Sequence, residues 1–344
     1  MIDLSSIDRY IKSLQRYAAG AYRKGPRIRR TDITSQFGPI QIIHGEDNSR
    51  YPYCRSVFID DDVKVLIDPG AGQQRLTELK QKHRIDMVLN THFHFDHIAY
   101  NYLFDESRIL INEKEAPCFR DRREIPRIIG IEEVYGTGWV DGWLERIANP
   151  TTERSPYSPQ NRHEWWLSTA RLDGEYKWGE VLDFGKTKMH VIGAPGHSGG
   201  FSCMYFPRYG AIYVADLDLT PFGPWYAGSD GDIDQFISSC REIENVDAEF
   251  FITSHEMGIL SREEFRAGMD EYLAIIDERD RQILSVLSTP LSLEEVARLG
   301  LIYGRKYHVD AWVYMWEFIT IRKHLQRMER QQRVSRIGDR YVAV

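Results

Sequence analysis

Short apolar runs recur along the chain from about residue 36 to residue 253. Each run is rich in β-branched and aromatic residues and is bounded by Gly, Pro, Asp or Asn, which is typical of β-strands. Helical spacing of apolar residues lies between some of them, at Gln73–Lys82 and near Ile98–Leu103. Strands interleaved with helices predict an α/β sandwich with two sheets inside and helices outside. The predicted strands are Pro39–His44, Arg55–Ile59, Val63–Ile67, Ile85–Asn90, Arg108–Ile111, Val181–Phe184, Lys188–Ile192, Phe201–Phe206, Ala211–Ala215 and Glu249–Thr253.

The strand pattern is lost between about residues 113 and 178. This stretch combines several Pro and Arg residues with a group of tryptophans, and we interpret it as a helical insertion. We expect its aromatic residues to pack inside the insertion, with a ligand wall as the alternative. The tryptophans are Trp139, Trp143, Trp165, Trp166 and Trp178.

Helical periodicity resumes after Ser261. Ser261 precedes Glu264 by three residues and Ser292 precedes Glu295 by three, the pattern of a capping box at the start of a helix. A long helix ending near Arg330 follows, and then a β-like tail with a Gly turn. Helix, short helix, longer helix and two-stranded wing predict a small winged-helix-like module.

Ahead of the strands, residues 7–18 show helical spacing behind Ser6, and residues 23–30 form a basic run broken by Gly and Pro. We interpret that run as a solvated linker, with contact to an anion or nucleic acid as the alternative. The predicted division is an N-terminal helix and linker at 1–35, an α/β domain at 36–260 with its insertion at about 113–178, and a C-terminal domain at 261–344.

Composition narrows the class of protein. Among 344 residues 42% are hydrophobic, which excludes wholesale disorder, and the net charge is −7. No apolar run approaches the length of a membrane span, and the N-terminus has no secretory pattern. The four cysteines are scattered without a CxxC motif, which favours a reducing compartment. We therefore expect a cytoplasmic protein that does not enter a membrane.

Imidazole and carboxylate groups concentrate between Thr91 and His97, directly after the predicted strand that ends at Asn90. If the strand persists, His92 and His94 lie on one face because side chains alternate. The carboxylate and the third imidazole then occupy the turn that leaves the strand. Such donors suit zinc and similar divalent ions. Coincidental surface histidines are the alternative, which this spacing disfavours.

Three further candidate ligands each follow a predicted strand. His197 lies in a glycine-rich loop, Asp216 follows Ala215, and His255 follows the strand that ends at Thr253. A single His or Asp at a strand end is more often structural. Together, and in this order, the three predict the remainder of a two-metal site.

The series His92-x-His94-x-Asp96-His97, followed by His197, Asp216 and His255, resembles the metallo-β-lactamase superfamily over roughly residues 36–260. The resemblance implies an αββα sandwich, with a helical insertion here, whose dinuclear metal site lies at one edge of the two sheets. It implies a hydrolase with two divalent metal ions. The implied roles are His92, His94 and His197 on the first metal, Asp96, His97 and His255 on the second, Asp216 as the bridge, and Asp68 as partner of a ligand histidine.

The resemblance also implies a mechanism. His94 stands where the redox di-iron branch has Glu, which favours zinc and hydrolysis, with iron and manganese as alternatives. A hydroxide bridging the metals would attack an electrophilic carbon or phosphorus, and Asp96 would orient it.

Stiff aromatic residues in 218–226 are candidates for a substrate pocket, with packing against the sheet edge as the alternative. They are Phe222, Trp225 and Tyr226, the last with a hydroxyl for an oxyanion.

The C-terminal module resembles the small winged-helix tail of the glyoxalase II-like, lactamase-β-like branch. Residues 322–344 hold seven basic and two acidic side chains, a net charge of +5, which would suit phosphate groups. We expect hydrolysis of an ester, thioester or lactone of a small molecule. A phosphodiesterase or endoribonuclease that holds nucleic acid with this module is the alternative. A DNA-binding regulator is a third hypothesis, and a homodimer stays open. The chain has neither the glutathione-binding pattern of glyoxalase II nor the inserted domain of the RNA-cleaving β-CASP branch.

Overall fold

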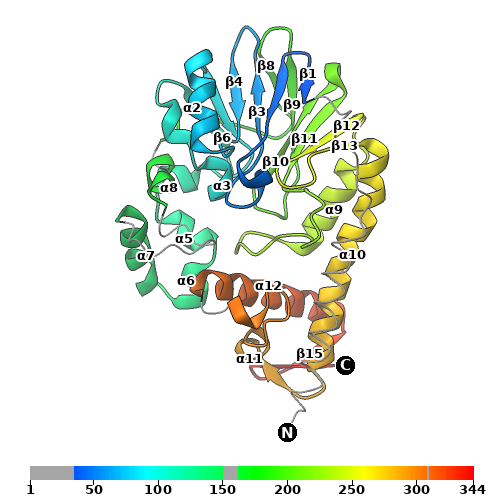
Figure 1. The fold of residues 1–344 in the computed structure, drawn as a ribbon. Coiled ribbons are helices and arrows are strands. Elements are labelled where there is room, and N and C mark those ends of the chain that lie inside the picture. Colours follow the sequence, from blue (N-terminus) through cyan, green and yellow to red (C-terminus); the bar gives the residue numbers. More distant parts are fainter. Residues whose placement is uncertain (1–34, 150–161, 170, 308–309) are drawn as a thin grey trace.

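The computed structural model describes residues 35–149, 162–169, 171–307 and 310–344. Two β-sheets lie face to face with helices on their outer sides, and a smaller, mainly helical module lies beyond one end of the sheets (Figure 1). The predicted α/β class is therefore confirmed. The helix predicted at 7–18 and the basic run at 23–30 lie outside the described residues.

The first sheet has the order β1-β2-β3-β4-β5-β6-β7. Neighbours are antiparallel up to β4 and parallel from β4 to β7, so the carboxyl ends of β4, β5 and β6 meet at one edge. Its strands are β1 (Gln36–Phe37), β2 (Ile40–Ile43), β3 (Ser56–Ile59), β4 (Val65–Ile67), β5 (Met87–Asn90), β6 (Arg108–Asn112) and β7 (Gly174–Tyr176). β7 was not predicted: it lies inside the insertion predicted at about 113–178, whose described helices end at Ser168.

The second sheet has the order β13-β12-β11-β10-β9-β8. Only β11 and β12 are parallel neighbours, and their carboxyl ends also share one edge. Its strands are β8 (Val181–Asp183), β9 (Lys188–Gly193), β10 (Ser202–Phe206), β11 (Ala211–Ala215), β12 (Phe250–Thr253) and β13 (Ile259–Ser261). The predicted strands of this region are confirmed, and β13 is additional.

Successive side chains of a strand point to opposite faces of its sheet, so they belong to different buried layers. Val57 and Val191 belong to a buried cluster between the two sheets, whereas Phe58 belongs to a second buried cluster with Leu76 of helix α2 (Gln73–Lys82). Burying one such side chain stabilises the fold by about 1.5–3 kcal/mol. The short helices α3 (Phe95–Ile98), η1 (Asp47–Ser49), η2 (Asn101–Phe104) and η4 (Pro207–Tyr209) complete this part of the chain.

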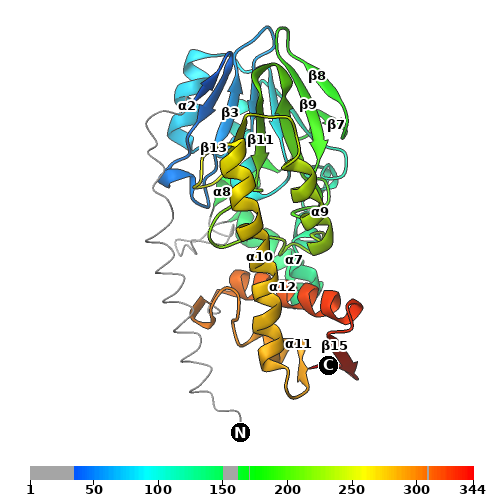
Figure 2. The same ribbon diagram turned by 90° about the vertical axis from the view of Figure 1, so that its right-hand side faces the viewer.

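Two helices cover the outer face of the second sheet, α9 (Ile233–Ile243) and α10 (Arg262–Val286). Phe265 of α10 stacks on Phe251 of β12 with ring centroids 4.2 Å apart. Phe236 of α9 joins the same buried cluster. Helix α10 then continues beyond the sheets into the C-terminal module (Figure 2). One long helix thus belongs to both parts of the molecule.

The insertion is helical, as predicted. Trp143 and Trp165 are buried there, and Trp165 stacks on Phe95 with centroids 4.8 Å apart. Because Phe95 lies between the predicted ligands His94 and Asp96, the insertion packs directly behind the candidate site. Its described helices are α4 (Pro117–Arg120), α5 (Glu124–Ile128), α6 (Ile131–Tyr135), α7 (Gly138–Ala148) and α8 (His163–Ser168).

The C-terminal module begins with α10, and both predicted capping boxes are confirmed, at Ser261 and at Ser292. A small sheet of order β14-β16-β15 accompanies its helices. The elements after α10 are β14 (Leu291–Ser292), α11 (Leu293–Ala297), η5 (Arg305–Tyr307), α12 (Ala311–Arg330), β15 (Val334–Ile337) and β16 (Arg340–Ala343). This element order agrees with the predicted one, and its assignment as a winged helix stays a prediction. None of the described helices combines the length and apolar character needed to cross a membrane.

A buried carboxylate joins α10 to α12. Asp280 is fully buried and accepts hydrogen bonds from His324 Nδ1 at 2.6 Å, Arg327 Nη1 at 3.0 Å and Arg333 Nη1 at 2.7 Å. Burial alone raises the pKa of Asp280, but His324 and the arginines outweigh it and hold that pKa below its ordinary value. On its other side, His324 Nε2 lies 2.8 Å from the hydroxyl of Tyr226. The network therefore links both helices to the loop at 218–226.

Replacing Asp280 is expected to be strongly destabilising. Asp280→Ala leaves Arg327 and Arg333 without this carboxylate in a buried setting, so the free energy of unfolding should fall by about 3 kcal/mol. Asp270→Ala on the same helix is the matched control. It removes an exposed ion pair to Arg241, which is worth about 0–1 kcal/mol. Urea unfolding of both variants checks this, and equal small losses would contradict it.

Lys323 of α12 reaches toward the α/β domain. Its ammonium group donates hydrogen bonds to the carbonyl oxygens of Gly228 and Gly231, and its side chain is 8% exposed. Burial lowers the pKa of Lys323 to about 8. An unfolded lysine titrates near 10.4, so between these values the unfolded chain holds a proton that the folded chain lacks.

The pKa of Lys323 predicts a pH-dependent stability. Because a rise in pH from about 8 to 10.5 removes the proton that favours unfolding, wild type should gain about 2–3 kcal/mol relative to Lys323→Met over this range. Lys82→Met, at an exposed position, is the control and should show no such trend. Urea unfolding at a series of pH values measures the difference. A constant gap between wild type and Lys323→Met would overturn this account.

Candidate metal centre

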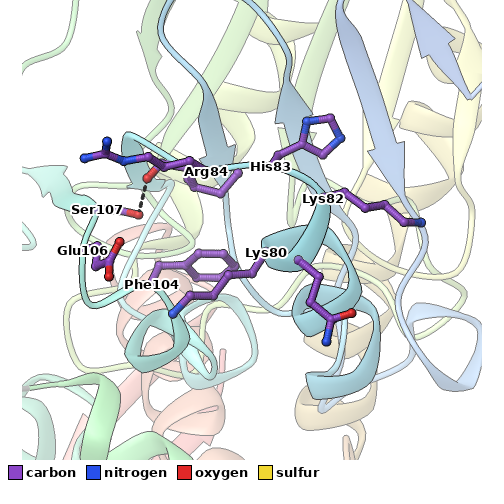
Figure 3. A pocket seen from close by; sticks show the side chains of 9 residues that line it. Lys80, Lys82, His83, Arg84, Phe104, Glu106 and Ser107 are labelled. Atoms are coloured by element: carbon purple, nitrogen blue, oxygen red, sulfur yellow. Dashed lines mark hydrogen bonds between the residues drawn. The ribbon is translucent and has the colours of Figure 1, made fainter.

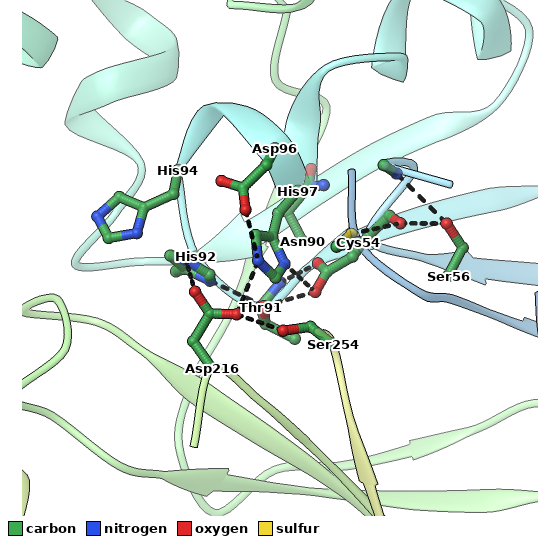
Figure 4. Close-up of polar contacts among 12 residues, drawn as sticks. Cys54, Ser56, Asn90, Thr91, His92, His94, Asp96, His97, Asp216 and Ser254 are labelled. Atoms are coloured by element: carbon green, nitrogen blue, oxygen red, sulfur yellow. Dashed lines mark hydrogen bonds and ion pairs between the residues drawn. The ribbon is translucent and has the colours of Figure 1, made fainter. Parts of the chain in front are cut away.

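The predicted ligands converge at the edge where the strands of both sheets end. β5 leads into His92 and His94, α3 carries Asp96 and His97, and the other three follow β9, β11 and β12. Figure 4 shows four of them drawn around Asp216. They form two groups whose ligand atoms lie within 4.8 Å of one another, His92, His94, His197 and Asp216 in one and Asp96, His97, Asp216 and His255 in the other.

In the first group the imidazole nitrogens point at a common centre. His197 Nε2 lies 3.2 Å from His92 Nε2 and 2.9 Å from His94 Nδ1. It also lies 3.1 Å from Oδ2 of Asp216. Three imidazoles and one carboxylate at this spacing are a zinc-type donor set.

The second group is richer in carboxylates. His255 Nε2 lies 3.1 Å from Oδ2 of Asp96, and His97 Nε2 lies 3.6 Å from the same oxygen. Oδ1 of Asp216 lies 2.9 Å from His97 Nε2 and 3.4 Å from His255 Nε2. Asp216 thus presents one oxygen to each group, as a carboxylate bridge does.

The buried donors fit metal ions. His97 Nε2 faces Asp216 Oδ1 and is buried without a hydrogen-bond partner among the described residues, although burying a polar atom without a partner is costly. Nitrogens of neighbouring imidazoles also face each other within hydrogen-bond distance, an arrangement that a shared cation favours. The residues present therefore suit two divalent ions.

Protonation states in the cluster agree with metal binding. Burial, with His97 and His94 adding to it, lowers the pKa of His92 well below its ordinary value, and burial with His197 does the same for His94. Both rings are therefore neutral and free to donate a lone pair. Burial is the largest effect and favours the neutral forms of His97 and His255 too, but Asp216, Asp96 and other anionic neighbours together outweigh it and raise both pKa values. The second group thus attracts positive charge, which a metal ion supplies.

Asp68 anchors the second group from behind. Its Oδ2 lies 2.8 Å from His97 Nδ1 and accepts hydrogen bonds from the hydroxyls of Thr91 at 2.7 Å and Tyr213 at 3.1 Å. Its Oδ1 accepts from the Thr91 backbone N–H at 2.7 Å. Figure 4 shows this side of the site. Asp68 therefore fixes both the orientation of the His97 ring and the start of the ligand loop.

Other ligand histidines are oriented by backbone carbonyls. His197 Nδ1 lies 2.9 Å from the carbonyl oxygen of Trp225, and His255 Nδ1 lies 2.9 Å from that of Ser49. Such contacts select the tautomer in which Nε2 carries the free lone pair. Ser254 donates to Asp216 Oδ1 at 2.5 Å and so holds the carboxylate that the two groups share.

The backbone is strained at the carboxyl ends of β4 and β11. Asp68 has φ = 50° and Ala215, just before Asp216, has φ = 47°, both in the left-handed region that non-glycine residues avoid. Each such residue costs on the order of 1–3 kcal/mol. Gly70 allows a close approach here, because a Cβ at this position would lie 1.8 Å from the carbonyl oxygen of Asp96. Strained residues thus lie at or next to groups that organise the site.

Glu115 was not predicted, yet it clamps the two ligand loops together. It is 2% exposed, and its Oε2 accepts from the backbone N–H of Phe93 at 3.2 Å. Its Oε1 accepts from Ser198 Oγ and from the Gly200 N–H, both at 2.6 Å. One carboxylate thus holds the loop of His92 and His94 to the loop of His197. Burial, with Asp230 adding to it, raises the pKa of Glu115 to about 8.

The candidate pocket residues have three different environments. The Trp225 ring lies edge-on to His94 with centroids 4.8 Å apart, next to the ligands. Phe222 is 42% exposed and packs on Tyr303 at 5.2 Å. The Tyr226 hydroxyl is buried between His324 Nε2 and Arg279 Nη1, which is 2.9 Å away, so it serves the contact with the C-terminal module.

Two hollows lie outside the ligand cluster. One, of about 270 Å³, lies by the amino ends of β5 and β6, at the edge opposite the ligands, and includes Lys80 and Arg84 (Figure 3). Lys80 there pairs with Asp105 at 3.1 Å. The other, of about 280 Å³, lies between residues 229–233 and α12 and includes Lys323 and Arg330.

Removing Glu115 should weaken metal binding. Glu115→Ala frees the two ligand loops from each other, so the affinity for zinc should fall about 10–100-fold, as is usual when a group that orients ligands is lost. The zinc affinity of Glu115→Gln should lie between those of wild type and Glu115→Ala, because the amide nitrogen of Gln cannot accept a hydrogen bond from the backbone donors. Glu113→Ala, two residues away and paired with exposed Lys177, should bind zinc like wild type. Competition with a chromophoric chelator measures the zinc affinity of each variant. Unchanged affinity in Glu115→Ala would contradict the role of Glu115 in holding the two loops together.

Residues 52–114, which include Asp68 and the ligands from His92 to His97, match the model of the Metallo-beta-lactamase superfamily. No curated protein gives a significant sequence match. A metallo-beta-lactamase family protein from Thermus thermophilus superposes with a TM-score of 0.64 at 19% identity, over 89% of this chain and 99% of that one. A beta-lactamase domain protein from Burkholderia ambifaria gives 0.60 at 14% identity, over 91% and 96%.

At these identities the solved structures show a shared fold. The matched segment includes the loop that carries four of the candidate ligands, His92, His94, Asp96 and His97. The match over residues 52–114, the shared fold and the converging candidate ligands agree with one another, and the chain is similar to proteins of the metallo-beta-lactamase superfamily.

Proposed function

We propose that this protein is a dinuclear metal-dependent hydrolase of an ester, thioester or lactone of a small molecule. The observation that supports it best is the division of the ligands into two groups that share Asp216. Two divalent ions about 3.5–4 Å apart lower the pKa of water and polarise the carbonyl oxygen under attack. Imidazole and carboxylate donors suit zinc, with iron and manganese as alternatives.

Residues of the chain have distinct parts in this reaction. His92, His94 and His197 would hold one ion, His97 and His255 the other, and Asp216 both. Asp96 also orients the attacking water, because its carboxylate belongs to the second group and is kept in place by His255 at 3.1 Å. Asp68 keeps His97 in the ring orientation that binding requires.

The nuclease alternative loses its main support, the basic C-terminal module. Five of its seven cations pair with carboxylates of the same chain: Arg322 with Glu133, Arg327 with Asp234 and Asp280, Arg330 with Asp234, Arg333 with Asp280, and Arg340 with Glu295. Lys323 is engaged by two carbonyl groups, and Arg336 lies over the ring of Tyr341 at 5.6 Å. Charges already paired in this way offer little to a phosphate backbone. An acyl substrate is therefore favoured over nucleic acid.

Hydrolysis should require the metal ions and their ligands. Protein stripped with a chelator and reloaded with zinc is tested on a panel of thioesters, esters and lactones, and on labelled single-stranded RNA at low salt. We expect acyl turnover by the loaded protein, at least 100-fold loss in His94→Ala and Asp216→Asn, and intact RNA. His190→Ala is the matched histidine control, because His190 contacts Tyr205 within the second sheet, and it should retain activity. Ligand-dependent RNA cleavage without acyl turnover would replace the proposal with the nuclease alternative.

A further inference from the structure

Partly exposed aromatic rings extend from the ligand cluster onto the C-terminal module. The first is Trp225, edge-on to His94 at 4.8 Å and 5.3 Å from the ring of His197. Its backbone carbonyl accepts from His197 Nδ1 when that nitrogen carries the proton. The position of Trp225 is therefore fixed relative to the reacting centre.

The next ring comes from α12. Trp316 lies edge-on to Trp225 at 5.9 Å, and it contacts Tyr303 at 5.9 Å and Tyr51 at 6.3 Å. All four rings are partly exposed, and they come from three regions that are distant in sequence, since Tyr303 and Trp316 both belong to the C-terminal module. We call Tyr51, Trp225, Tyr303 and Trp316 the aromatic wall.

The wall differs from the core behind it. Trp312, one turn before Trp316 on α12, is 5% exposed and stacks on buried Trp143 at 6.0 Å. The neighbouring Met315 is fully buried. Helix α12 thus places Trp312 and Met315 in the sealed core and leaves part of Trp316 accessible beside Trp225. Partly exposed aromatic surface next to a reactive centre is what binding of an apolar group requires.

The loop that carries Trp225 is held rigid by the C-terminal module. Arg279 of α10 donates to the carbonyl oxygens of Pro224 at 2.6 Å and Phe222 at 2.8 Å. Its Nη1 also donates to the Tyr226 hydroxyl at 2.9 Å, and its guanidinium lies over the ring of Phe222 at 5.0 Å, so these contacts fix the loop. The wall is therefore pre-organised, which reduces the entropy lost on binding.

We propose that the aromatic wall binds an apolar acyl group of the substrate, aromatic or straight-chain aliphatic, and that Trp316 gives the C-terminal module a direct part in substrate selection. This inference rests on the proposed acyl hydrolysis and specifies its substrate class. The reacting carbonyl lies at the ligand cluster, and the acyl group extends from it along Trp225 toward Trp316. Small polar acyl groups gain nothing from this surface.

Binding of carboxylate products tests the wall without requiring turnover. Zinc-loaded protein is titrated with acetate, butanoate, hexanoate, octanoate and benzoate, with calorimetry as the readout. The expected gain is about fourfold in affinity for each methylene that becomes buried, and benzoate should bind more tightly than acetate. Trp316→Ala should lose most of the dependence on chain length, and Trp316→Phe should restore part of it.

Phe318→Ala is the matched control, since Phe318 is a partly buried aromatic residue of the same helix whose ring contacts Tyr314. It should bind the series as wild type does. Zinc content is measured for every variant, so that loss of the metal centre is not mistaken for loss of the wall. If Trp316→Ala does not fold, Trp225→Ala on the loop provides the same test.

The outcomes separate this inference from the proposed function. Two results would contradict the proposed role of the aromatic wall. One is an affinity of wild type that does not depend on chain length, and the other is a Trp316→Ala protein that binds the series as wild type does. Binding that depends on chain length and is abolished in Trp316→Ala supports the role of the aromatic wall. If no ester or thioester is hydrolysed in that case, only the hydrolase proposal fails. Turnover of acetyl and octanoyl thioesters with equal kcat/KM would support the hydrolase proposal and contradict the proposed role of the aromatic wall.

Discussion

Burial of the carboxylates of Asp96 and Asp216 at the meeting edge of two sheets is the constraint on which the structure depends. Removing charged groups from water costs several kcal/mol each unless positive charge compensates them. Histidines from both sheets surround these carboxylates, and Asp216 is shared between the two groups. Several features keep these histidines next to the carboxylates. They are the strands that end here, the strained turns after β4 and β11, and the groups that hydrogen-bond to the far side of the imidazole rings.

The C-terminal module belongs to the same arrangement. Asp280, His324 and Tyr226 form a continuous set of hydrogen bonds from α10 and α12 to the loop that follows Asp216. Lys323 binds two carbonyls of the segment after that loop. Asp230 of this segment accepts from the Gly199 N–H at 2.7 Å, close to His197. Contacts thus run from the module to a ligand loop.

The sequence was most informative where function and local structure coincide. Ligands after strands were predictable because alternation and strand ends are local properties, and the capping boxes at Ser261 and Ser292 were predictable for the same reason. Glu115 left one usable signal, an acidic residue shortly after the parallel strand β6. Tyr226 was predicted to serve an oxyanion, but its partner His324 lies 98 residues further along the chain, and no local pattern shows it. β7 is only three residues long and pairs across the insertion, so periodicity could not reveal it.

Helix α10 has a consequence for how the molecule unfolds. It begins at the capping box beside β13, packs on the second sheet through Phe265, and ends within the C-terminal module. A helix of 25 residues shared in this way couples its two ends, because its hydrogen bonds form and break cooperatively. The boundary near residue 260 therefore separates two regions of sequence without separating two units of folding. Unfolding of the module would also loosen the loop beside the candidate metal ligands, so the amide hydrogens of both parts should exchange through one shared, cooperative opening.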